Sequence, residues 1–482
     1  MNYKLVFRML GNILRIETVC LLVPLAVALL DGGRDVKAFL ITVALTGAVG
    51  QGLSMLKDGG RKMQARDGYA TVALCWIVMS AFGALPYVIS GTIPHYISAF
   101  FETVSGFTTT GATVLSDLEQ YSMGVMWWRA QTQWMGGMGV LVLILALLPK
   151  TGEGSVQMMR AESPGPIKTK LVPKVGDTAK ILYSIYIALT VLETACLMLA
   201  GMSFYEAITH AMTSISTGGF SVKSASIAAY DSLAIEWIIT IFTFLSGVNF
   251  SLLYYAILRN FKSVFHSEEL RFYGTLVLGC AVAITTNLVL VGGMPVNFNT
   301  FTDAMFQVVT IVTTTGYATA DFALWPTFSN MILFMLMVMG ACAGSTAGGM
   351  KGVRVVLLCK NLRREVRRIL HPREVRAIRL DGERVEESIV SSVGLFFFAY
   401  IMLMLAGAVV VSWDNLGFAE SLSASLTCIA NVGPGLGALG PSGNFSVLSA
   451  FSQLVLSFLM LLGRLEILPL LVLLVPAMWK KR

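Results

Sequence analysis

A short stretch that ends in small polar residues and glycine recurs four times along this chain of 482 residues. The first half of each copy is mostly apolar and too short to cross a bilayer as a helix. Non-helical backbone at membrane depth is tolerated only where it is buried in protein or lines a watery cavity. Each copy therefore predicts a re-entrant half-helix followed by a loop that lines a cavity. The copies are residues 101–113, 205–220, 301–317 and 418–435.

The composition around these stretches is that of a membrane protein. Hydrophobic residues make up 55% of the chain and charged residues only 13%, whereas charged residues make up about a quarter of soluble domains. The fold class predicted is an all-α integral membrane protein. Apolar runs of about 20 residues predict ten spans: 13–30, 36–56, 69–91, 124–149, 178–200, 234–258, 271–292, 326–350, 388–412 and 447–479.

The placement of lysine and arginine predicts the orientation of these spans. Basic residues are concentrated in the connections after the second, fourth, sixth and eighth spans and near both ends of the chain. By the positive-inside bias, these connections and both termini are cytoplasmic. The four repeated stretches then face outward and run in the same sense. This predicts an N-terminal hairpin and four repeats of span, re-entrant helix, loop and span: 1–66, 67–160, 161–266, 267–385 and 386–482.

The last cytoplasmic connection has a local structure of its own. Residues 374–385 alternate apolar and polar residues around Asp381-Gly382. An Asp-Gly pair flanked by such alternation is typical of a two-residue hairpin turn. We expect a small β-hairpin on the cytoplasmic side.

The four loops predict a site for a monovalent cation. A helix ending at each loop directs the partial negative charge of its carbonyls into the cavity. Glycine there lets successive carbonyl oxygens face one axis and replace the hydration shell of an ion. The loops contain no carboxylate, which argues against Ca²⁺ or Mg²⁺. The predicted filter residues are Thr109, Thr110, Gly111, Ser216, Thr217, Gly218, Thr314, Thr315, Gly316, Asn431, Val432 and Gly433.

A glycine-rich segment at residues 340–352 predicts a gate. One interpretation is a small-residue helix face, because Gly340, Gly344 and Gly348 are spaced by four. The other is a broken helix whose flexible loop lies by the filter, and five glycines in thirteen residues favour the break.

Arg464 lies in the last apolar span, where a charge is costly unless it faces water or a partner. We expect it to face the pore, and the alternative is an ion pair with Glu466 or a contact with a helix terminus. The predicted gate residues are Gly344, Ser345, Thr346, Gly348, Gly349, Lys351 and Arg464.

These motifs resemble a known family. Residues 105–113, together with Trp127-Trp128-Arg129, residues 133–139, 216–220, 313–317 and 344–349, are similar to the bacterial TrkH/TrkG potassium-uptake subunits of the Trk/Ktr/HKT superfamily. The resemblance covers nearly the whole chain and includes the N-terminal hairpin.

The resemblance implies a potassium-selective pore in the bacterial inner membrane, with K⁺ bound at the filter residues. It aligns Gly111, Gly218, Gly316 and Gly433 as the four filter glycines, and it implies that the glycine-rich segment and Arg464 form the gate. It also implies a homodimer and a cytosolic nucleotide-binding ring protein of the TrkA type as regulator. The fourth loop, Asn431-Val432-Gly433, departs from the threonine pattern, so the filter is not expected to be fully symmetric.

Other functions fit the sequence less well. A coupled secondary transporter with discontinuous helices predicts inverted repeats and an ionisable residue at its site, although a cation-coupled (H⁺ or Na⁺) K⁺ symporter remains the alternative. The cysteines and histidines are dispersed without metal-ligand spacing. No nucleophile–base pair, P-loop or dinucleotide fingerprint is apparent. We therefore expect no enzyme activity, no cofactor and no nucleic-acid partner.

Overall fold

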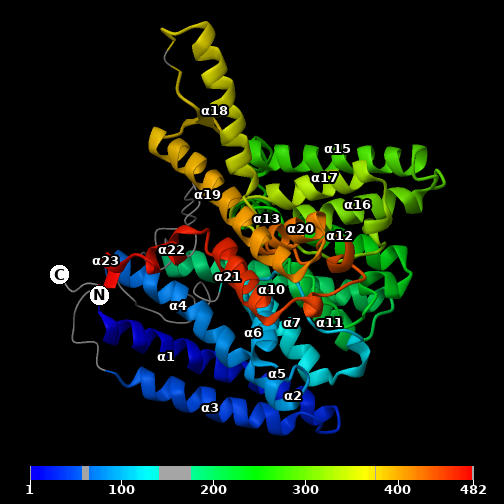
Figure 1. The fold of residues 1–482 in the computed structure, drawn as a ribbon. Coiled ribbons are helices and arrows are strands. Elements are labelled where there is room, and N and C mark those ends of the chain that lie inside the picture. Colours follow the sequence, from blue (N-terminus) through cyan, green and yellow to red (C-terminus); the bar gives the residue numbers. More distant parts are fainter. Residues whose placement is uncertain (1, 57–63, 140–174, 375, 480–482) are drawn as a thin grey trace.

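A computed structural model describes residues 2–56, 64–139, 175–374 and 376–479. Helices dominate this part of the chain (Figure 1). The predicted boundary between the first and second repeats falls outside the described residues. Within them, six helices are long and apolar enough to cross a membrane, or seven if one bent pair is counted as a span.

The N-terminal helices form a hairpin on one flank of the molecule (Figure 1). The chain runs through α1 (Tyr3–Cys20) and α2 (Leu22–Leu30) and returns through α3 (Val36–Ser54) along α1. The Tyr3 ring stacks on Trp479 near the other end of the chain, and its hydroxyl donates to the Trp479 carbonyl. Both ends of the described chain therefore lie together on one side of the molecule.

The rest of the chain repeats one order of elements. A long helix is followed by a short buried helix, an irregular loop and a second helix that ends early. The first set is α4 (Ala65–Gly83), α5 (Leu85–Ser90), α6 (Tyr96–Phe107) and α7 (Met123–Gly137), and the second is α10 (Val175–Leu199), α11 (Phe204–Ile215), α12 (Leu233–Ser246) and α13 (Phe250–Ile257). The third set is α15 (Glu268–Leu290), α16 (Phe298–Val312), α17 (Thr327–Met339) and α18 (Gly352–Leu370). The fourth set is α19 (Glu387–Val411), α20 (Phe418–Ala430), α21 (Ala450–Arg464) and α22 (Leu468–Leu473).

The four short helices, α6, α11, α16 and α20, have defined starts and buried ends. Ser203 caps α11 by accepting from the Glu206 amide, and Asn297 caps α16 by accepting from the Thr300 amide, which satisfies amides that lack a helical partner. The C-terminal halves of the four helices are buried, except for the half-buried Met212 of α11. The helices therefore start near the surface and end in the interior.

The prediction of ten continuous spans is wrong for the second helix of several repeats. Helix α12 ends at Ser246, and the chain turns by 102° into α13. Helix α17 ends at Met339 before Gly340, whose φ of 65° a helix cannot accommodate. Helix α21 ends at Arg464, before the break at 465–467. The predicted spans 234–258, 326–350 and 447–479 are therefore interrupted, and span 124–149 extends beyond the described residues after α7.

Helix α18 stands away from the body of the molecule as an arm (Figure 1). The predicted β-hairpin follows it: β1 (Arg379–Leu380) pairs antiparallel with β2 (Glu383–Arg384) around Asp381-Gly382. Both turn residues have positive φ, of 50° and 84°, as the Asp-Gly turn requires. The hairpin prediction is confirmed.

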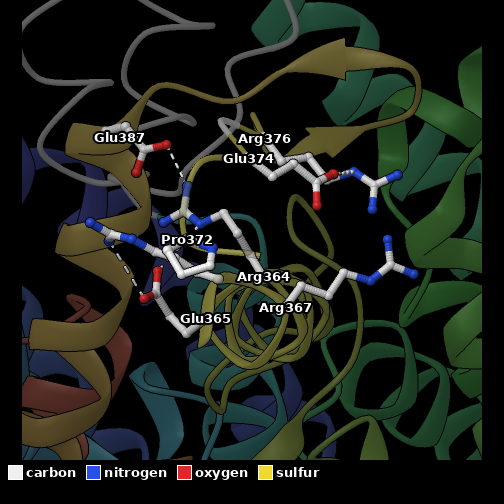
Figure 2. A pocket seen from close by; sticks show the side chains of 8 residues that line it. Arg364, Glu365, Arg367, Pro372, Glu374, Arg376 and Glu387 are labelled. Atoms are coloured by element: carbon white, nitrogen blue, oxygen red, sulfur yellow. Dashed lines mark hydrogen bonds and ion pairs between the residues drawn. The ribbon is translucent and has the colours of Figure 1, made fainter. Parts of the chain in front are cut away.

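Side-chain ion pairs connect the arm to the start of α19. Figure 2 shows Arg364 of α18 between Glu387 of α19 and Glu365 of its own helix. Arg367 and Arg376 lie near one another on another side of the same pocket, where Arg376 is paired with Glu374 (Figure 2). The outer half of the arm is therefore strongly basic, with carboxylates interspersed.

Candidate functional site

The loops after the four short helices share one backbone conformation. The first position of each has positive φ, between 55° and 60°: Thr109, Thr217, Thr314 and Asn431. The second position donates its amide to the carbonyl five residues earlier, over 2.8–2.9 Å: Thr110, Gly218, Thr315 and Val432. The third position is a glycine with φ between 76° and 106°: Gly111, Gly219, Gly316 and Gly433. We call these twelve residues the filter ring.

This register corrects one predicted correspondence. Gly218 was aligned with Gly111, but the structural equivalent of Gly111 is Gly219. The reason is that helix geometry sets the register: the Gly218 amide bonds the Thr213 carbonyl as the Thr110 amide bonds that of Ser105. Gly218 thus stands where loops one and three have threonine. Ser216 lies one position before the ring.

The four loops contact one another in a closed cycle. Each third-position glycine faces the second-position carbonyl of the next loop. A β-carbon added at Gly111 would lie 2.3 Å from the oxygen of Gly218, one at Gly219 1.7 Å from that of Thr315, one at Gly316 2.2 Å from that of Val432, and one at Gly433 2.6 Å from that of Thr110. Real β-carbons do not approach backbone oxygens so closely. Positive φ and lack of space both require glycine at these positions.

Two first-position side chains in the ring have polar atoms without a described partner. The Thr109 hydroxyl and the Asn431 side-chain oxygen are buried and accept or donate no hydrogen bond within the described residues. Buried polar atoms are nearly always satisfied. These oxygens lie at equivalent positions in adjacent loops, together with the ends of α6 and α20, whose C-terminal dipoles favour positive charge. The arrangement can supply oxygen ligands to a cation.

A buried ion pair contacts the segments that follow the filter ring in the first two loops. Arg129 of α7 donates through Nε to Glu102 of α6 over 2.7 Å and through Nη1 to the Ser221 carbonyl over 2.8 Å. The Glu102 carboxylate also accepts from the Thr113 hydroxyl and the Val114 amide, each over 2.9 Å. The pair therefore joins the segments that follow the ring in loops one and two.

The glycine-rich segment after α17 is a loop. Residues 340–351 are non-helical, so the broken-helix prediction is confirmed and the continuous small-residue helix is wrong. The Cys342 amide donates to the carbonyl of Gly247, which follows the last residue of α12. In the other direction, the amide of Phe250, the first residue of α13, donates to the Gly344 carbonyl. The Thr346 hydroxyl lies 3.1 Å from the Ile215 carbonyl and 3.2 Å from that of Ser246. We call residues 340–351 together with Arg464 the gate layer, after the role that the sequence predicts for them.

The gate layer also bonds directly to the filter ring. The Gly348 amide donates to the Thr314 hydroxyl over 2.7 Å, and the Gly349 amide donates to the Ala430 carbonyl at the end of α20 over 2.8 Å. The ammonium group of Lys351 bonds the Ala347 carbonyl within the loop. Ser345 closes a turn through its hydroxyl to the Cys342 carbonyl. The loop is thus closed on itself and tied to two of the four filter loops.

Arg464, the last residue of α21, connects the gate layer to the end of α7. Its guanidinium donates to the Thr346 carbonyl over 2.9 Å and to the carbonyls of Gly136 and Gly137, the latter over 2.7 Å. The carbonyls at a helix end lack helical partners, and a guanidinium offers several donors in one plane. The expected contact between Arg464 and the glycine-rich loop is therefore present.

Of the structural alternatives for Arg464, the contact with a helix terminus is present, at the last carbonyls of α7. The pairing with Glu466 is wrong. Glu466 instead pairs with Arg354 in the first turn of α18, and the Arg354 guanidinium lies 4.0 Å over the Phe396 ring of α19. Glu466 lies in the break after α21 with a positive φ of 55°, and its carboxylate contacts Arg354 and not Arg464 two residues before it. The pair connects the first turn of α18, at the base of the arm, to the break that follows Arg464.

With this geometry described, comparison with known proteins is informative. The family model described as TrkH, cation transport protein, matches residues 35–481. This chain belongs to the TrkH family. Curated TrkH-family relatives include the Trk system potassium uptake protein TrkH of Halomonas elongata, 36% identical over all of both chains, and TrkG of Escherichia coli, 34% identical over 99% of both. The crystal structure of the potassium transporter TrkH from Vibrio parahaemolyticus superposes with a TM-score of 0.88 at 33% identity, covering all of both chains.

Membership of the TrkH family confirms the resemblance drawn from the motifs, and these relatives are transporters. Sequence reasoning missed two buried groups that bond the filter loops: the Glu102–Arg129 pair, and Gln133 of α7, whose amide bonds the Gly218 carbonyl and the Phe220 amide. A signal for the pair existed, because both residues are ionisable and lie in segments that are otherwise apolar, where a charge requires a partner. Gln133 gave no such signal, since a single amide is common in helices.

Proposed function

We propose that this chain is the potassium-conducting subunit of an uptake system in the bacterial inner membrane. The observation that carries the proposal is the closed cycle of four loops, each with glycine against the carbonyl of the next loop. A ring of carbonyl and hydroxyl oxygens can replace the hydration shell of K⁺. We assign K⁺ coordination to the filter ring, with Gly219 in the place first given to Gly218.

Further parts of this proposal extend the same architecture. The four sets of helices surround one pore as four parallel repeats, and α1 to α3 form an additional hairpin at the side. Both termini are cytoplasmic, in keeping with the contact between Tyr3 and Trp479. Residues 1–66, 67–160, 161–266, 267–385 and 386–482 are the corresponding units. The protein acts as a homodimer with one pore in each chain.

The gate layer closes the pore on the cytoplasmic side of the ring. Thr346 and Arg464 satisfy carbonyls at the ends of α11, α12 and α7. An arginine on the ion path adds an electrostatic barrier to cations. Gly344, Gly348 and Gly349 give the loop the freedom to change conformation.

The arm transmits regulation to this gate. Helix α18 begins directly after the loop and continues for 19 residues, a length of about 28 Å at 1.5 Å per residue. Its outer half combines basic residues with an exposed apolar stripe, Leu362, Val366 and Ile369. A cytosolic nucleotide-binding ring protein of the TrkA type docks on this surface and shifts the population of gate conformations.

The test of the proposal is cation flux into liposomes that contain only this protein. We expect radioactive rubidium to enter and K⁺ to compete far better than Na⁺. Gly111→Ser places a β-carbon 2.3 Å from the Gly218 oxygen and should lower the preference for K⁺ about tenfold, equivalent to ~1.4 kcal/mol. A wild-type protein without K⁺ preference, or a variant with unchanged preference, contradicts the assignment.

The same assay separates conduction from the alternative, a symporter coupled to H⁺ or Na⁺. Conduction predicts that K⁺ moves down its own electrochemical gradient without a second gradient. Flux that requires an imposed H⁺ or Na⁺ gradient favours the symporter. The parallel arrangement of the four loops favours conduction.

A further inference from the structure

The second filter loop differs from the others at its second position. Loops one and three have Thr110 and Thr315 there, and loop four has Val432. In loops one and three a neighbouring hydroxyl supports the threonine: Thr108 lies 2.7 Å from Thr110, and Thr313 lies 2.9 Å from Thr315. Loop two has Gly218 and therefore lacks any side chain for such a contact.

The amide of Gln133 occupies the space left by the missing side chain. A β-carbon added at Gly218 would lie 2.3 Å from Cδ, 2.5 Å from Oε1 and 2.8 Å from Nε2 of Gln133, and these are its three nearest neighbours. Gln133 comes from α7 of the preceding repeat and is fully buried. Gly218 and Gln133 are thus complementary in shape.

Both polar atoms of this amide bond the filter loop. Gln133 Nε2 donates to the Gly218 carbonyl over 2.6 Å, and Oε1 accepts from the Phe220 amide over 3.0 Å. The two contacts bracket Gly219. The Gly218 oxygen held in this way is the atom that faces Gly111 across the contact between loops one and two.

We propose that Gln133 is a positioning residue for ion selectivity, which holds the Gly218 carbonyl in the ring as the Thr108–Thr110 and Thr313–Thr315 hydroxyl pairs hold loops one and three. This inference rests on the proposed function of the ring. Selectivity depends on the number and field strength of the coordinating oxygens. A loop that loses its support lets one oxygen move, and the smaller Na⁺ then binds relatively better.

A complementary pair of substitutions tests the proposal. Gln133→Ala removes both hydrogen bonds and leaves space beside Gly218, so the K⁺ preference over Na⁺ in the liposome assay should fall about tenfold. The double variant Gln133→Ala/Gly218→Thr fills that space with the residue type found in loops one and three. Its new hydroxyl would lie near Ser216, which stands where those loops have Thr108 and Thr313. We expect the double variant to recover most of the lost preference.

Controls separate this role from ordinary packing. Gln133→Met keeps the length of the side chain but has no hydrogen-bond donor and only a weak acceptor, so it should lose selectivity as Gln133→Ala does. If the alanine variant does not fold, the methionine variant provides the test. A role in folding alone predicts lower yield and lower flux of both ions at an unchanged ratio. An unchanged ratio in either folded single variant overturns the inference, whereas a wild-type protein without K⁺ preference overturns the proposed function itself.

Discussion

The filter ring and the gate layer lie next to each other but are held in opposite ways. In the ring, four loops of equivalent conformation each place a glycine against a neighbouring backbone oxygen, so every loop limits the next. The gate layer is a single loop with one arginine, and hydrogen bonds attach it to its surroundings. A ring closed by packing is rigid. A loop held by hydrogen bonds worth about 1 kcal/mol each can be displaced.

The largest effect should follow from a side chain in the ring. Gly219→Ala combines a φ of 76° with a β-carbon 1.7 Å from the Thr315 oxygen. Strained backbone costs about 1–3 kcal/mol, and the clash adds to it. We expect K⁺ flux to fall by at least about a hundredfold, which corresponds to ~2.8 kcal/mol, as measured by rubidium uptake with protein amount held equal.

Gly218→Ala is the matched control one residue away. The three heavy atoms nearest to its β-carbon all belong to the side chain of Gln133, which can shift more easily than a backbone carbonyl. Its flux should remain well above that of Gly219→Ala. Equal effects at the two positions would mean that the cycle of contacts does not define the ring.

In the gate layer, loss of a side chain should increase flux instead. Arg464→Ala removes the donors to Thr346, Gly136 and Gly137 and the positive charge that the proposed function places on the ion path. We expect basal K⁺ flux without a cytosolic partner to rise about tenfold at unchanged preference for K⁺. Deletion of several residues within 340–351 should have the same sign.

The yield of folded protein determines how a different result for Arg464→Ala is interpreted. Arg464→Lys keeps the charge but replaces the planar set of donors by one ammonium group, so its flux should lie between those of wild type and alanine. Normal yield with unchanged or reduced basal flux in both Arg464→Ala and the loop deletion would remove the gate assignment. Poor yield of the alanine variant alone would give Arg464 a role in stability.

The sequence predicted the residues of the filter ring better than the contacts of the gate layer, because a repeated motif can be recognised from the sequence alone. Four threonine- and glycine-rich stretches at the end of short apolar runs identified the loops, and five glycines near Gly344 identified the break. The register of the second loop relative to the other three was harder to predict. In Ser216-Thr217-Gly218-Gly219 two glycines are adjacent, and only the hydrogen bonds at the helix end show which of them matches Gly111.

Contacts between distant segments could not be read from the chain. Arg464 and Glu466 are close in sequence and opposite in charge, yet each bonds elsewhere, because the break after α21 separates their directions. The break between α12 and α13 was also hidden. Apolar composition continues through residues 234–258, and hydropathy does not distinguish a straight helix from one that bends at Gly247.

The smallest expected effect concerns the bond that joins the two regions. The hydroxyl of Thr314 in the filter ring accepts from the amide of Gly348 in the gate layer. Thr314→Val keeps the shape of the side chain and removes this acceptor. A hydrogen bond of about 1 kcal/mol should favour the closed loop roughly fivefold. Basal K⁺ flux of the valine variant should therefore rise about fivefold, less than for Arg464→Ala.

Thr109→Val provides the control, because Thr109 is the equivalent residue of loop one and bonds no gate residue among those described. Each valine substitution removes one hydroxyl from the first position of a filter loop, and the K⁺ preference of each variant, measured in the same assay, reports its effect on ion binding separately from basal flux. Only Thr314→Val should also loosen the gate. A difference in basal flux between the two variants, measured at equal protein in liposomes, therefore reports coupling between ring and gate. Equal flux would show that the rigid and the displaceable regions act independently, and that the Thr314–Gly348 bond contributes nothing to closure.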